Sequence, residues 1–374
     1  MKKMTAGTEL KQKNRSNIYK AFRENKSLTR QDLVSKLDLS LPTVTQNLQE
    51  LQNEGLICEN GTVGNTGGRR AKTYSIVSDA KTAIGIEITM HHIVAVAIDL
   101  CGRIITSLQR RETFSRTDEY YRVLGDMVDA VISNAGLSRE NILGVGFGVQ
   151  GLITEDNQTV FYGEILHFTG MTCSEFTKYI DLPAALFNDA NASCFAEMWI
   201  NPDLRNAFYI MLSNSVGGAI YIDRQQYNGE NIRAGEVGHI IIVPGGKKCY
   251  CGQRGCLDPY CTATMLSSLT DGNLAAFFEI LDQGDPHAAI VWDEYLTHLA
   301  TAVSDIRMLF DCPVIIGGYV GIYIDKYLND LKSRIAGKSS FENNADYILP
   351  CRFKTEAIAT GAALNFIQKF LSTI

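Results

Sequence analysis

No apolar run in the 374-residue sequence approaches the roughly 18–20 residues that a membrane-spanning helix needs. The first residues, MKKMTAGTELKQKNRSN, are basic, but they lack the apolar segment of a secretory signal. These two absences argue against a membrane protein and predict a protein of the cytoplasm. The ten cysteines are then expected to be reduced thiols with packing or metal-binding roles, because disulfides are rare in that compartment.

Charge is distributed unevenly along the chain. Residues 1–76 carry 13 Lys and Arg against 7 Asp and Glu, which is a net charge of +6. The remaining residues carry 22 basic and 34 acidic side chains, which is a net charge of −12. A basic N-terminal segment on an acidic body suggests a polyanionic partner, although a merely solvated basic surface would have the same composition.

The basic segment has the pattern of a helix-turn-helix. Thr29 and Ser40 are placed to cap two short helices. Pro42 falls in the first turn of the second helix, where its missing N–H costs nothing, and Gly55 is placed to end that helix. The second helix has one apolar face at helical spacing, formed by Val44, Leu48 and Leu51.

The other face of this helix and a following loop form the predicted DNA-binding surface. Four short polar side chains that suit base edges and phosphates are expected to be exposed: Thr43, Thr45, Gln46 and Asn47. Strands over residues 56–59 and 72–77 are expected to flank a Gly-rich wing that carries Arg69 and Arg70. Residues 1–77 are therefore predicted to form a winged helix-turn-helix that binds double-stranded operator DNA. The alternative is a small oligomerisation module with a solvated polar face.

From residue 81 onward, strands alternate with amphipathic helices. Residues 83–112 have the pattern of three strands joined by two turns, and residues 206–223 repeat a strand–turn–strand pattern. Helices and short buried strands follow each of these segments. The twofold arrangement predicts two related α/β lobes with a ligand cleft between them.

Five motifs connect this body to a known family. They are NDAN (188–191), EVGH (236–239), CYCGQRGCLD (249–258), IIGG (315–318) and ATGAAL (359–364). On these motifs the chain resembles the ROK family of sugar-responsive repressors, related open reading frames and sugar kinases. The resemblance implies an actin/hexokinase-like sugar-binding body over residues 81–374, with lobes of roughly 81–186 plus the C-terminal helix, and 187–354. It covers nearly the whole chain, because the repressor branch also has an N-terminal winged helix-turn-helix.

Metal-ligand side chains are concentrated in one short segment. A C-x-C-x4-C pattern with a histidine ten residues before it supplies three thiolates and one imidazole, which is typical of closed, tetrahedral structural zinc. Zn²⁺ is expected to be bound by His239, Cys249, Cys251 and Cys256, with no open position for catalysis. The alternative is three buried free thiols. The nearby Cys261 is expected to pack in the core, as are the scattered Cys58, Cys101, Cys173, Cys194, Cys312 and Cys351.

The resemblance also implies a sugar site whose floor the metal would hold in place. In ROK proteins the glutamate and histidine of the E-x-G-H motif and the acid after the last cysteine contact sugar hydroxyls; here they are Glu236, His239 and Asp258, the last being shorter than the usual glutamate. NDAN adds Asn188 and Asp189, of which the aspartate is the general base in the kinases. Both residues would also suit a simple helix cap.

The nucleotide site is where the sequence departs from the kinases of the family. Their first phosphate loop, D-x-G-x-T, is replaced by EITMH (87–91), and serines stand among the first residues of the second loop, SNSVGGA (213–219). Side chains at these places obstruct the approach of a phosphate to the backbone. We therefore expect no enzyme activity, with Asp189 as a vestigial base position. Glu164 or Ile165 stands where the kinases have a sugar-contacting asparagine. The sequence therefore does not identify the sugar.

These features together predict a sugar-responsive transcriptional regulator, most simply a repressor. It would bind its operator as a homodimer or homotetramer and release it on binding a monosaccharide or a sugar phosphate. That coupling requires the sugar to bind two lobe arrangements unequally. Two alternatives stay open: an active ATP-dependent sugar kinase with an appended DNA-binding domain, and a body that docks a protein partner instead of a sugar.

Overall fold

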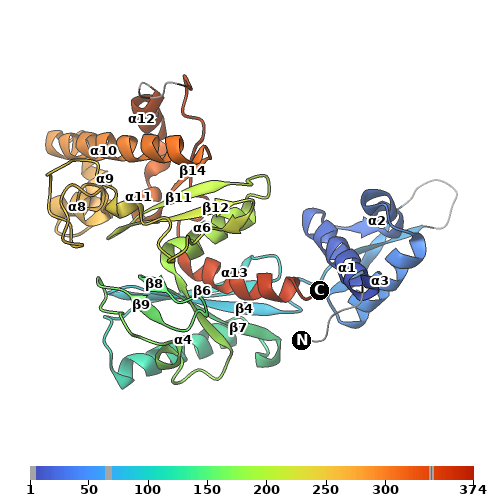
Figure 1. The fold of residues 1–374 in the computed structure, drawn as a ribbon. Helices are drawn as coiled ribbons and strands as arrows, with labels where there is room; N and C mark the ends of the chain where they lie inside the picture. The colour runs from blue at the N-terminus through green and yellow to red at the C-terminus, as the bar shows by residue number, and fades with distance from the viewer. Residues whose placement is uncertain (1–5, 64–69, 337, 339–340) are drawn as a thin grey trace.

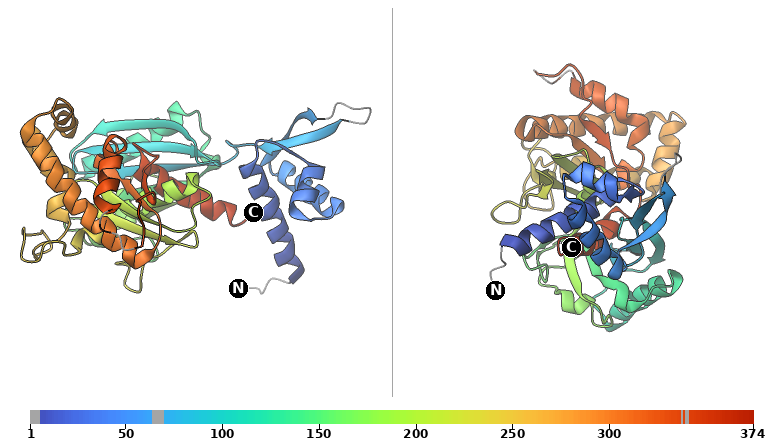
Figure 2. Two further views of the ribbon diagram at one scale, coloured as in Figure 1. Left: turned by 90° about the horizontal axis from the view of Figure 1, so that it is seen from above. Right: turned by 90° about the vertical axis from the view of Figure 1, so that its right-hand side faces the viewer.

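The structure, a computed structural model, describes residues 6–63, 70–336, 338 and 341–374. A small N-terminal domain stands beside two stacked lobes, and the C-terminus lies at the junction between them (Figures 1 and 2). Within these ranges no helix combines the length and the apolar character needed to cross a membrane.

The N-terminal domain is a winged helix-turn-helix. It contains α1 (Ala6–Glu24), α2 (Arg30–Leu37) and α3 (Leu41–Asn53), and an antiparallel sheet of β1 (Leu28–Thr29), β3 (Ala71–Ile76) and β2 (Ile57–Val63) in that order. Thr29 caps α2 through a capping box, and the Ser40 hydroxyl accepts a hydrogen bond from the Thr43 N–H at the start of α3. Gly55 follows α3 with φ 71°, so the predicted caps and helix end are confirmed.

One side chain predicted to face DNA is turned inward. Asn47 is only 2% exposed, and its Nδ2 donates to the Thr43 carbonyl at 2.8 Å. The expectation that Asn47 is exposed is therefore wrong. The reason is helical spacing: residue 47 lies three positions after Val44 and four before Leu51, which places it on the apolar stripe that packs against the domain core.

The first lobe is built on a five-stranded sheet. Its order is β10 (Ala184–Asn188), β7 (Ile142–Val149), β4 (Thr82–Ile88), β5 (His92–Asp99) and β6 (Ile104–Arg111). The strands β4, β7 and β10 are parallel neighbours, so their carboxyl ends meet at one edge, which faces the second lobe. Helices α4 (Asp118–Asn134) and α13 (Ala357–Leu371) cover the two faces, and the hairpin of β8 (Leu152–Ile153) and β9 (Val160–Tyr162) and the short helix α5 (Cys173–Phe176) complete the lobe.

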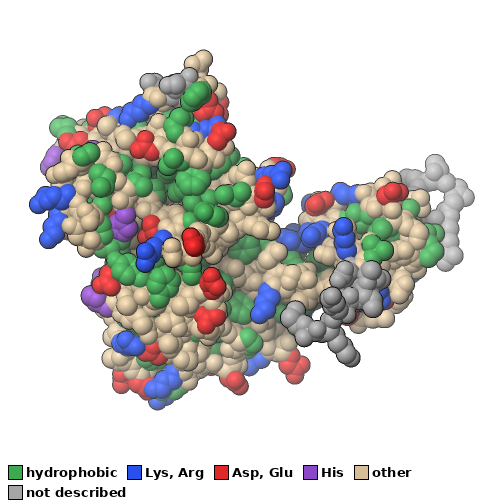
Figure 3. All heavy atoms as spheres, in the orientation of Figure 1, with side chains coloured by type: hydrophobic (Ala, Val, Ile, Leu, Met, Phe, Trp, Pro, Cys, Tyr) green, Lys and Arg blue, Asp and Glu red, His purple; other side chains and the backbone are tan. Residues whose placement is uncertain are grey.

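The second lobe repeats this plan. Its sheet has the order β13 (Gln225–Gln226), β12 (Val216–Ile222), β11 (Ala207–Leu212), β14 (Val314–Gly317) and β15 (Ile348–Pro350). Its helices are α7 (Asp258–Cys261), α8 (Ala263–Ser267), α9 (Leu274–Asp282), α10 (Pro286–Phe310), α11 (Gly318–Gly321) and α12 (Ile324–Ala336). Figure 3 shows hydrophobic side chains gathered on the visible face of this lobe.

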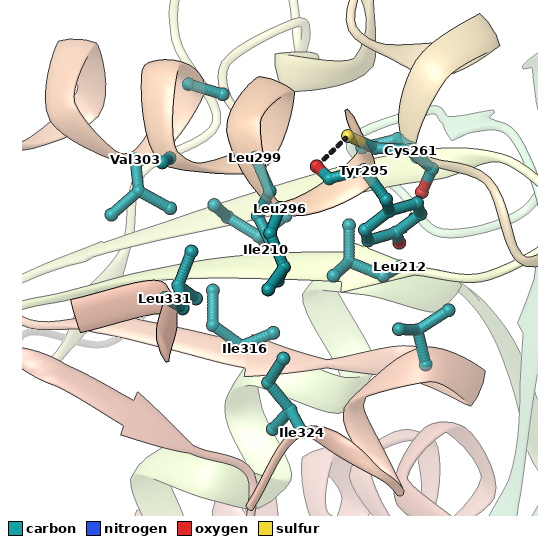
Figure 4. Packing of buried hydrophobic residues seen from close by; sticks show 14 of the residues in the cluster. Ile210, Leu212, Cys261, Tyr295, Leu296, Leu299, Val303, Ile316, Ile324 and Leu331 are labelled. Carbon is teal, nitrogen blue, oxygen red and sulfur yellow. Dashed lines mark hydrogen bonds between the residues drawn. The ribbon is translucent and has the colours of Figure 1, made fainter. Parts of the chain in front are cut away.

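Packing of α10 on the sheet forms the core of the second lobe. Figure 4 shows Leu296 and Leu299 of α10 above Ile210 of β11, and all three side chains are fully buried. Cys261 lies at the edge of this core with its Sγ 3.8 Å from the Tyr295 carbonyl, so its predicted packing role is confirmed. The same expectation is wrong for Cys58, which is exposed on strand β2.

The helix α6 (Asp189–Ile200) connects the two lobes and lies against α13. A Cβ atom at Gly361 of α13 would lie 1.8 Å from the Ala192 carbonyl oxygen of α6, so only glycine permits this approach. Figure 1 shows both helices between the two sheets, with the end of α13 reaching the N-terminal domain. The two helices therefore extend from the cleft between the lobes toward the domain junction.

Candidate functional site

A pocket lies between the lobes at the carboxyl ends of the parallel strands of the first lobe. Gln150 follows β7, and Asn188 and Asp189 end β10 and begin α6. The second lobe contributes Ser215, from the turn between β11 and β12, and Glu236. The carboxyl edge of a parallel sheet is the usual place for a ligand in α/β proteins. We refer to this cavity as the sugar pocket.

The two residues of the NDAN motif serve as helix cap and as pocket lining at once. The Asn188 Oδ1 accepts a hydrogen bond from the Asn191 N–H, and the Asp189 Oδ1 accepts one from the Ala190 N–H, both at 2.9 Å. Asn188 Nδ2 also donates to the Gly151 carbonyl at 3.0 Å. These bonds leave the second carboxyl oxygen of Asp189 available to a ligand.

The other three predicted sugar residues are not equivalent. Glu236 lines the sugar pocket, whereas His239 and Asp258 are not among its lining residues. Asp258 is buried, and its Oδ1 accepts the Val216 N–H at 2.8 Å, so its carboxylate fixes the start of β12. The Nε2 of His239 lies 3.1 Å from the hydroxyl of Tyr250, which does line the pocket.

Sequence reasoning missed four polar residues of the pocket, which are Gln150, Tyr162, Ser215 and Tyr250. Gln150 Nε2 donates to the Ser215 hydroxyl at 3.3 Å, so this bond joins the two lobes across the pocket. The position of Gln150, directly after a buried strand that is parallel to its neighbours, was a usable signal. The tyrosines come from a short hairpin and from the cysteine loop, where no pattern of spacing marks them.

The structure brings the four predicted metal ligands together. The ligand atoms of His239, Cys249, Cys251 and Cys256 all lie within 4.8 Å of one another. The Sγ atoms of Cys251 and Cys256 are 3.8 Å apart, which matches the separation of about 3.8 Å that Zn–S bonds of about 2.3 Å give in a tetrahedron. Gly255 has φ +83°, and a Cβ there would lie 1.8 Å from the Val243 carbonyl oxygen, so closing the loop requires glycine. The donor set and its geometry fit a four-coordinate metal ion.

Two buried carboxyl groups lie at the inner end of the cleft. Glu87, near the end of β4, is 7% exposed, and Asp189 is 6% exposed. Burial raises the pKa of Glu87 to about 7, and the nearby carboxylates of Asp189 and Glu356 act in the same direction. Burial also raises the pKa of Asp189 to about 7. Among the described residues, no hydrogen-bond donor reaches the carboxyl group of Glu87.

The candidate nucleic-acid interface is the outer face of the N-terminal domain. Figures 1 and 2 show α3 and the β2–β3 hairpin on the side away from the lobes, with α1 nearer to them. Gln46 is exposed, Thr43 and Thr45 are half-buried, and Arg70 is exposed at the start of β3. Arg69 lies outside the described residues.

Known protein families match the N-terminal domain and the two-lobed body separately. Residues 83–369 match the ROK family, and residues 11–57 match the winged helix-turn-helix DNA-binding family. The chain is 26% identical over 379 residues to the xylose repressor of Bacillus subtilis (strain 168), with 98% of each protein covered.

Two solved structures share the fold. A ROK family transcriptional regulator, a homolog of the E. coli MLC protein, matches with a TM-score of 0.75 and 22% identity over 97% of both chains. The ROK hexokinase from Thermus thermophilus matches with a TM-score of 0.64 and 21% identity over 77% of this chain and 99% of that one. The fold is therefore shared by regulators and by sugar kinases.

The buried carboxyl of Glu87 makes a prediction about stability. Its folded-state pKa of about 7 exceeds the ordinary 4.5, so the folded protein keeps a proton that the unfolded chain has lost, and stability falls as the pH rises between these values. At about pH 4, urea unfolding should give the same free energy of unfolding for Glu87→Gln as for the wild type. At about pH 8, the free energy of unfolding of Glu87→Gln should exceed that of the wild type by about 3 kcal/mol. Glu230→Gln, at an exposed position, is the control and should show no such difference. A gain for Glu87→Gln that is equal at both pH values would contradict this account.

Proposed function

The chain belongs to the ROK family and carries a winged helix-turn-helix domain, and from this we propose that it is a sugar-responsive transcriptional repressor. It binds operator DNA through the N-terminal domain and releases it when a saccharide occupies the cleft between the lobes. The full-length likeness to a xylose repressor supports this assignment, since it spans both the DNA-binding domain and the body.

The observation that carries the proposal is the path of helix α6. Its first residue, Asp189, lies in the sugar pocket, and Trp199 near its other end contacts the N-terminal domain. The guanidinium of Arg23, on α1, lies 3.9 Å from the centre of the Trp199 ring. A helix of 12 residues spans about 18 Å, so one rigid element links the ligand site to the DNA-binding domain.

The far end of α6 is held firmly. The indole Nε1 of Trp199 donates to the Cys101 carbonyl at 2.9 Å. Arg224 donates to the Met198 carbonyl at 2.9 Å, which satisfies a carbonyl at the C-terminal end of the helix. A shift of α6 at the pocket is therefore passed to Trp199 and not absorbed by fraying of the helix.

The junction around Trp199 is a continuous core. Side chains of α1 and of the body share one buried cluster, which includes Ile18, Tyr19, Phe22, Leu100, Leu364 and Ile367. Gln12 Nε2 also donates to the Thr373 carbonyl at 3.4 Å. Because packed cores move between discrete arrangements, a change in the lobes reorients the N-terminal domain as a unit.

A sugar acts on this system by changing the relation between the lobes. The hydrogen bond between Gln150 and Ser215 spans the pocket, and a saccharide competes for both groups. The sugar shifts DNA binding only by as much as it prefers one lobe arrangement over the other. Asn188, Asp189 and Glu236 supply the acceptors that orient its hydroxyls.

We propose further that the body does not transfer phosphate. Thr89 closes the turn after β4, where its hydroxyl donates to the His92 carbonyl at 3.0 Å, and the side chain of Met90 lines the cleft. The carboxyl of Glu87 and the side chain of Asn214 also face this region. An active sugar kinase remains the second candidate because the hexokinase fold is shared, and ADP release with a panel of sugars separates the two.

The metal in our proposal is a structural Zn²⁺ ion. It would be held by the Cys249, Cys251 and Cys256 thiolates and by the Nδ1 atom of His239, which faces Cys249 at 3.7 Å. When bound, the ion supplies a cross-link that holds the loop and the imidazole in place. The Nε2–H of His239 is then free to donate to the hydroxyl of Tyr250 at 3.1 Å, which orients a side chain of the sugar pocket.

We propose that the repressor acts as a homodimer or homotetramer. Helix-turn-helix proteins bind half-sites about 34 Å apart, which requires two copies of the domain. An apolar groove on the second lobe, lined by Ile240, Met308, Leu309 and Phe310, supports self-association, since Leu309 is 77% exposed.

The central prediction concerns DNA release. DNA from upstream of the protein's own gene should bind tightly in a fluorescence anisotropy assay at fixed salt, and a saccharide should release it. Tight binding that no saccharide alters would contradict the sugar response and favour a protein partner. The absence of specific DNA binding would contradict the repressor assignment and favour the kinase.

A second prediction concerns the contact between Arg23 and Trp199. Arg23→Gln should have the wild-type affinity for DNA measured without sugar and for sugar measured without DNA. The factor by which sugar weakens DNA binding should be about fivefold smaller in this variant, because a contact worth about 1 kcal/mol between the two linked sites is lost. Anisotropy titrations with and without sugar measure this factor. Arg122→Gln, which removes a similar cation–π contact with Tyr179 in the first lobe, is the control. If sugar weakens DNA binding equally in Arg23→Gln and in the wild type, the contact between Arg23 and Trp199 does not couple the two sites.

A third prediction concerns the metal. Cys256→Ser should lose the bound zinc, measured by elemental analysis of the purified protein, and should bind sugar more weakly because the cysteine loop loosens. Cys58→Ser, at an exposed thiol far from the cluster in the fold, should keep the zinc. Full zinc content in Cys256→Ser would overturn the ligand assignment.

A further inference from the structure

The cleft continues inward beyond the sugar pocket. Four residues, Gln150, Ile165, Asp189 and Met211, line both the sugar pocket and a second, deeper cavity. The deeper cavity adjoins a third one of about 460 Å³, with which it shares Glu87, Thr89, Met90, Asn214 and Tyr319. We call these two cavities the inner channel. The third cavity alone falls within the range of about 300–1,000 Å³ typical of ligand sites, whereas the sugar pocket and the deeper cavity measure about 60 and 90 Å³.

The acidic side chains of the cleft disfavour an anionic ligand. Carboxyl groups of Glu164, Asp189 and Glu236 line the sugar pocket, and no Lys, Arg or His does so among the described residues. Glu87 and Asp189 line the deeper cavity, again without a basic partner in the described part of the chain. A phosphate or a carboxylate in this setting would lie beside several acidic groups, with no basic side chain of the described residues lining the two cavities to balance its charge.

The basic side chains that line the third cavity do not offset the acidic side chains of the cleft. Lys354 lines it, but its ammonium is engaged in an ion pair with Asp325. Glu356 faces the same space, and the histidines of the turn after β4, His91 and His92, lie at its edge. Within the described parts of the chain, the inner channel therefore offers no Lys or Arg side chain that is free of an ion pair.

The carboxyl group of Glu87 can accept hydrogen bonds from a ligand. The residue is 7% exposed, its carboxyl has no donor among the described residues, and it lines both cavities of the inner channel. A carboxyl that lines a cavity and has no protein donor is open to ligand hydroxyls, which can donate hydrogen bonds to it. The remaining walls are largely apolar, formed by Ile88, Met90, Leu166, Met211, Tyr319 and Ile358. Acceptors on one side and apolar or aromatic surface on the other match the hydroxyl edge and the C–H face of a sugar ring.

We propose that the effector is an uncharged saccharide of at least two units. One unit occupies the sugar pocket against Asn188 and Asp189, and the next occupies the inner channel between Glu87 and Tyr319. This inference rests on the proposed function, because it specifies the ligand of the same cleft. It narrows the effector from monosaccharides and sugar phosphates to neutral saccharides that are extended past Asp189.

Calorimetric titration of the full-length protein with matched sugars tests the proposal. The probes are glucose, xylose, mannose and galactose, the disaccharides maltose, cellobiose, xylobiose, mannobiose and lactose, and glucose 6-phosphate and mannose 6-phosphate. We expect one disaccharide to bind at least about tenfold more tightly than its component monosaccharides, and the phosphate esters to bind more weakly than the free sugars. A monosaccharide that binds as tightly as every disaccharide, or a phosphate ester that binds most tightly, would overturn the proposal.

Variants of the inner channel separate a ligand contact from a structural effect. Tyr319→Ala should weaken the disaccharide about tenfold more than the monosaccharide, so the ratio of the two affinities falls. Glu87→Gln, which keeps the shape of the side chain, should narrow the discrimination against phosphate esters. Tyr227→Ala, at an exposed position outside the channel, is the control and should leave the ratio unchanged. An unchanged ratio in Tyr319→Ala would place the second unit elsewhere.

DNA anisotropy in the same samples separates failure of this inference from failure of the proposed function. If monosaccharides alone release the DNA, the extended ligand is wrong and the sugar-responsive repressor stands. If the DNA is bound but no saccharide binds or releases it, both proposals are wrong.

Discussion

The close contact between helix α13 and its neighbours is the constraint on which the arrangement of the lobes depends. A Cβ at Gly85 of β4 would lie 1.8 Å from the Ala359 carbonyl oxygen, and one at Gly361 would lie equally close to the Ala192 carbonyl oxygen of α6. The helix is therefore clamped between the sheet of the first lobe and α6 with almost no side chain in between. Small residues at these positions fix the distance of α6 from the first sheet, and with it the width of the cleft.

The position of α6 in turn sets the geometry of both functional ends of the molecule. Its N-terminus presents Asp189 beside Gln150, at the edge where the parallel strands end. Its C-terminal end presents Trp199 to Arg23 of the N-terminal domain. Because α6 cannot slide against α13 without a steric clash, the two helices move together, and the N-terminal domain that packs on α13 moves with them. A rigid element with two fixed ends is a physical basis for coupling that needs no long chain of weak contacts.

Local features of this structure could be predicted from the sequence, because the groups involved lie within a few residues of one another. The caps at Thr29 and Ser40 and the cysteine loop are of this kind. The inward turn of Asn47 could have been predicted from helical spacing, which outweighs the polarity of the side chain. The bond between Gln150 and Ser215 could not, since it joins segments that only the packing of the two lobes brings together.

The buried carboxyls of the cleft give a ligand a means of acting on the lobes. Glu87 and Asp189 are held close enough for one to raise the pKa of the other, and no cation compensates them among the described residues. In the absence of a ligand this arrangement destabilises the fold, and such costs concentrate at functional sites. In the proposed mechanism, a ligand whose hydroxyls donate to both groups offsets this cost most fully in the lobe arrangement that places both carboxyls against it. Such a difference in binding free energy between two lobe arrangements is what a ligand needs to move the N-terminal domain.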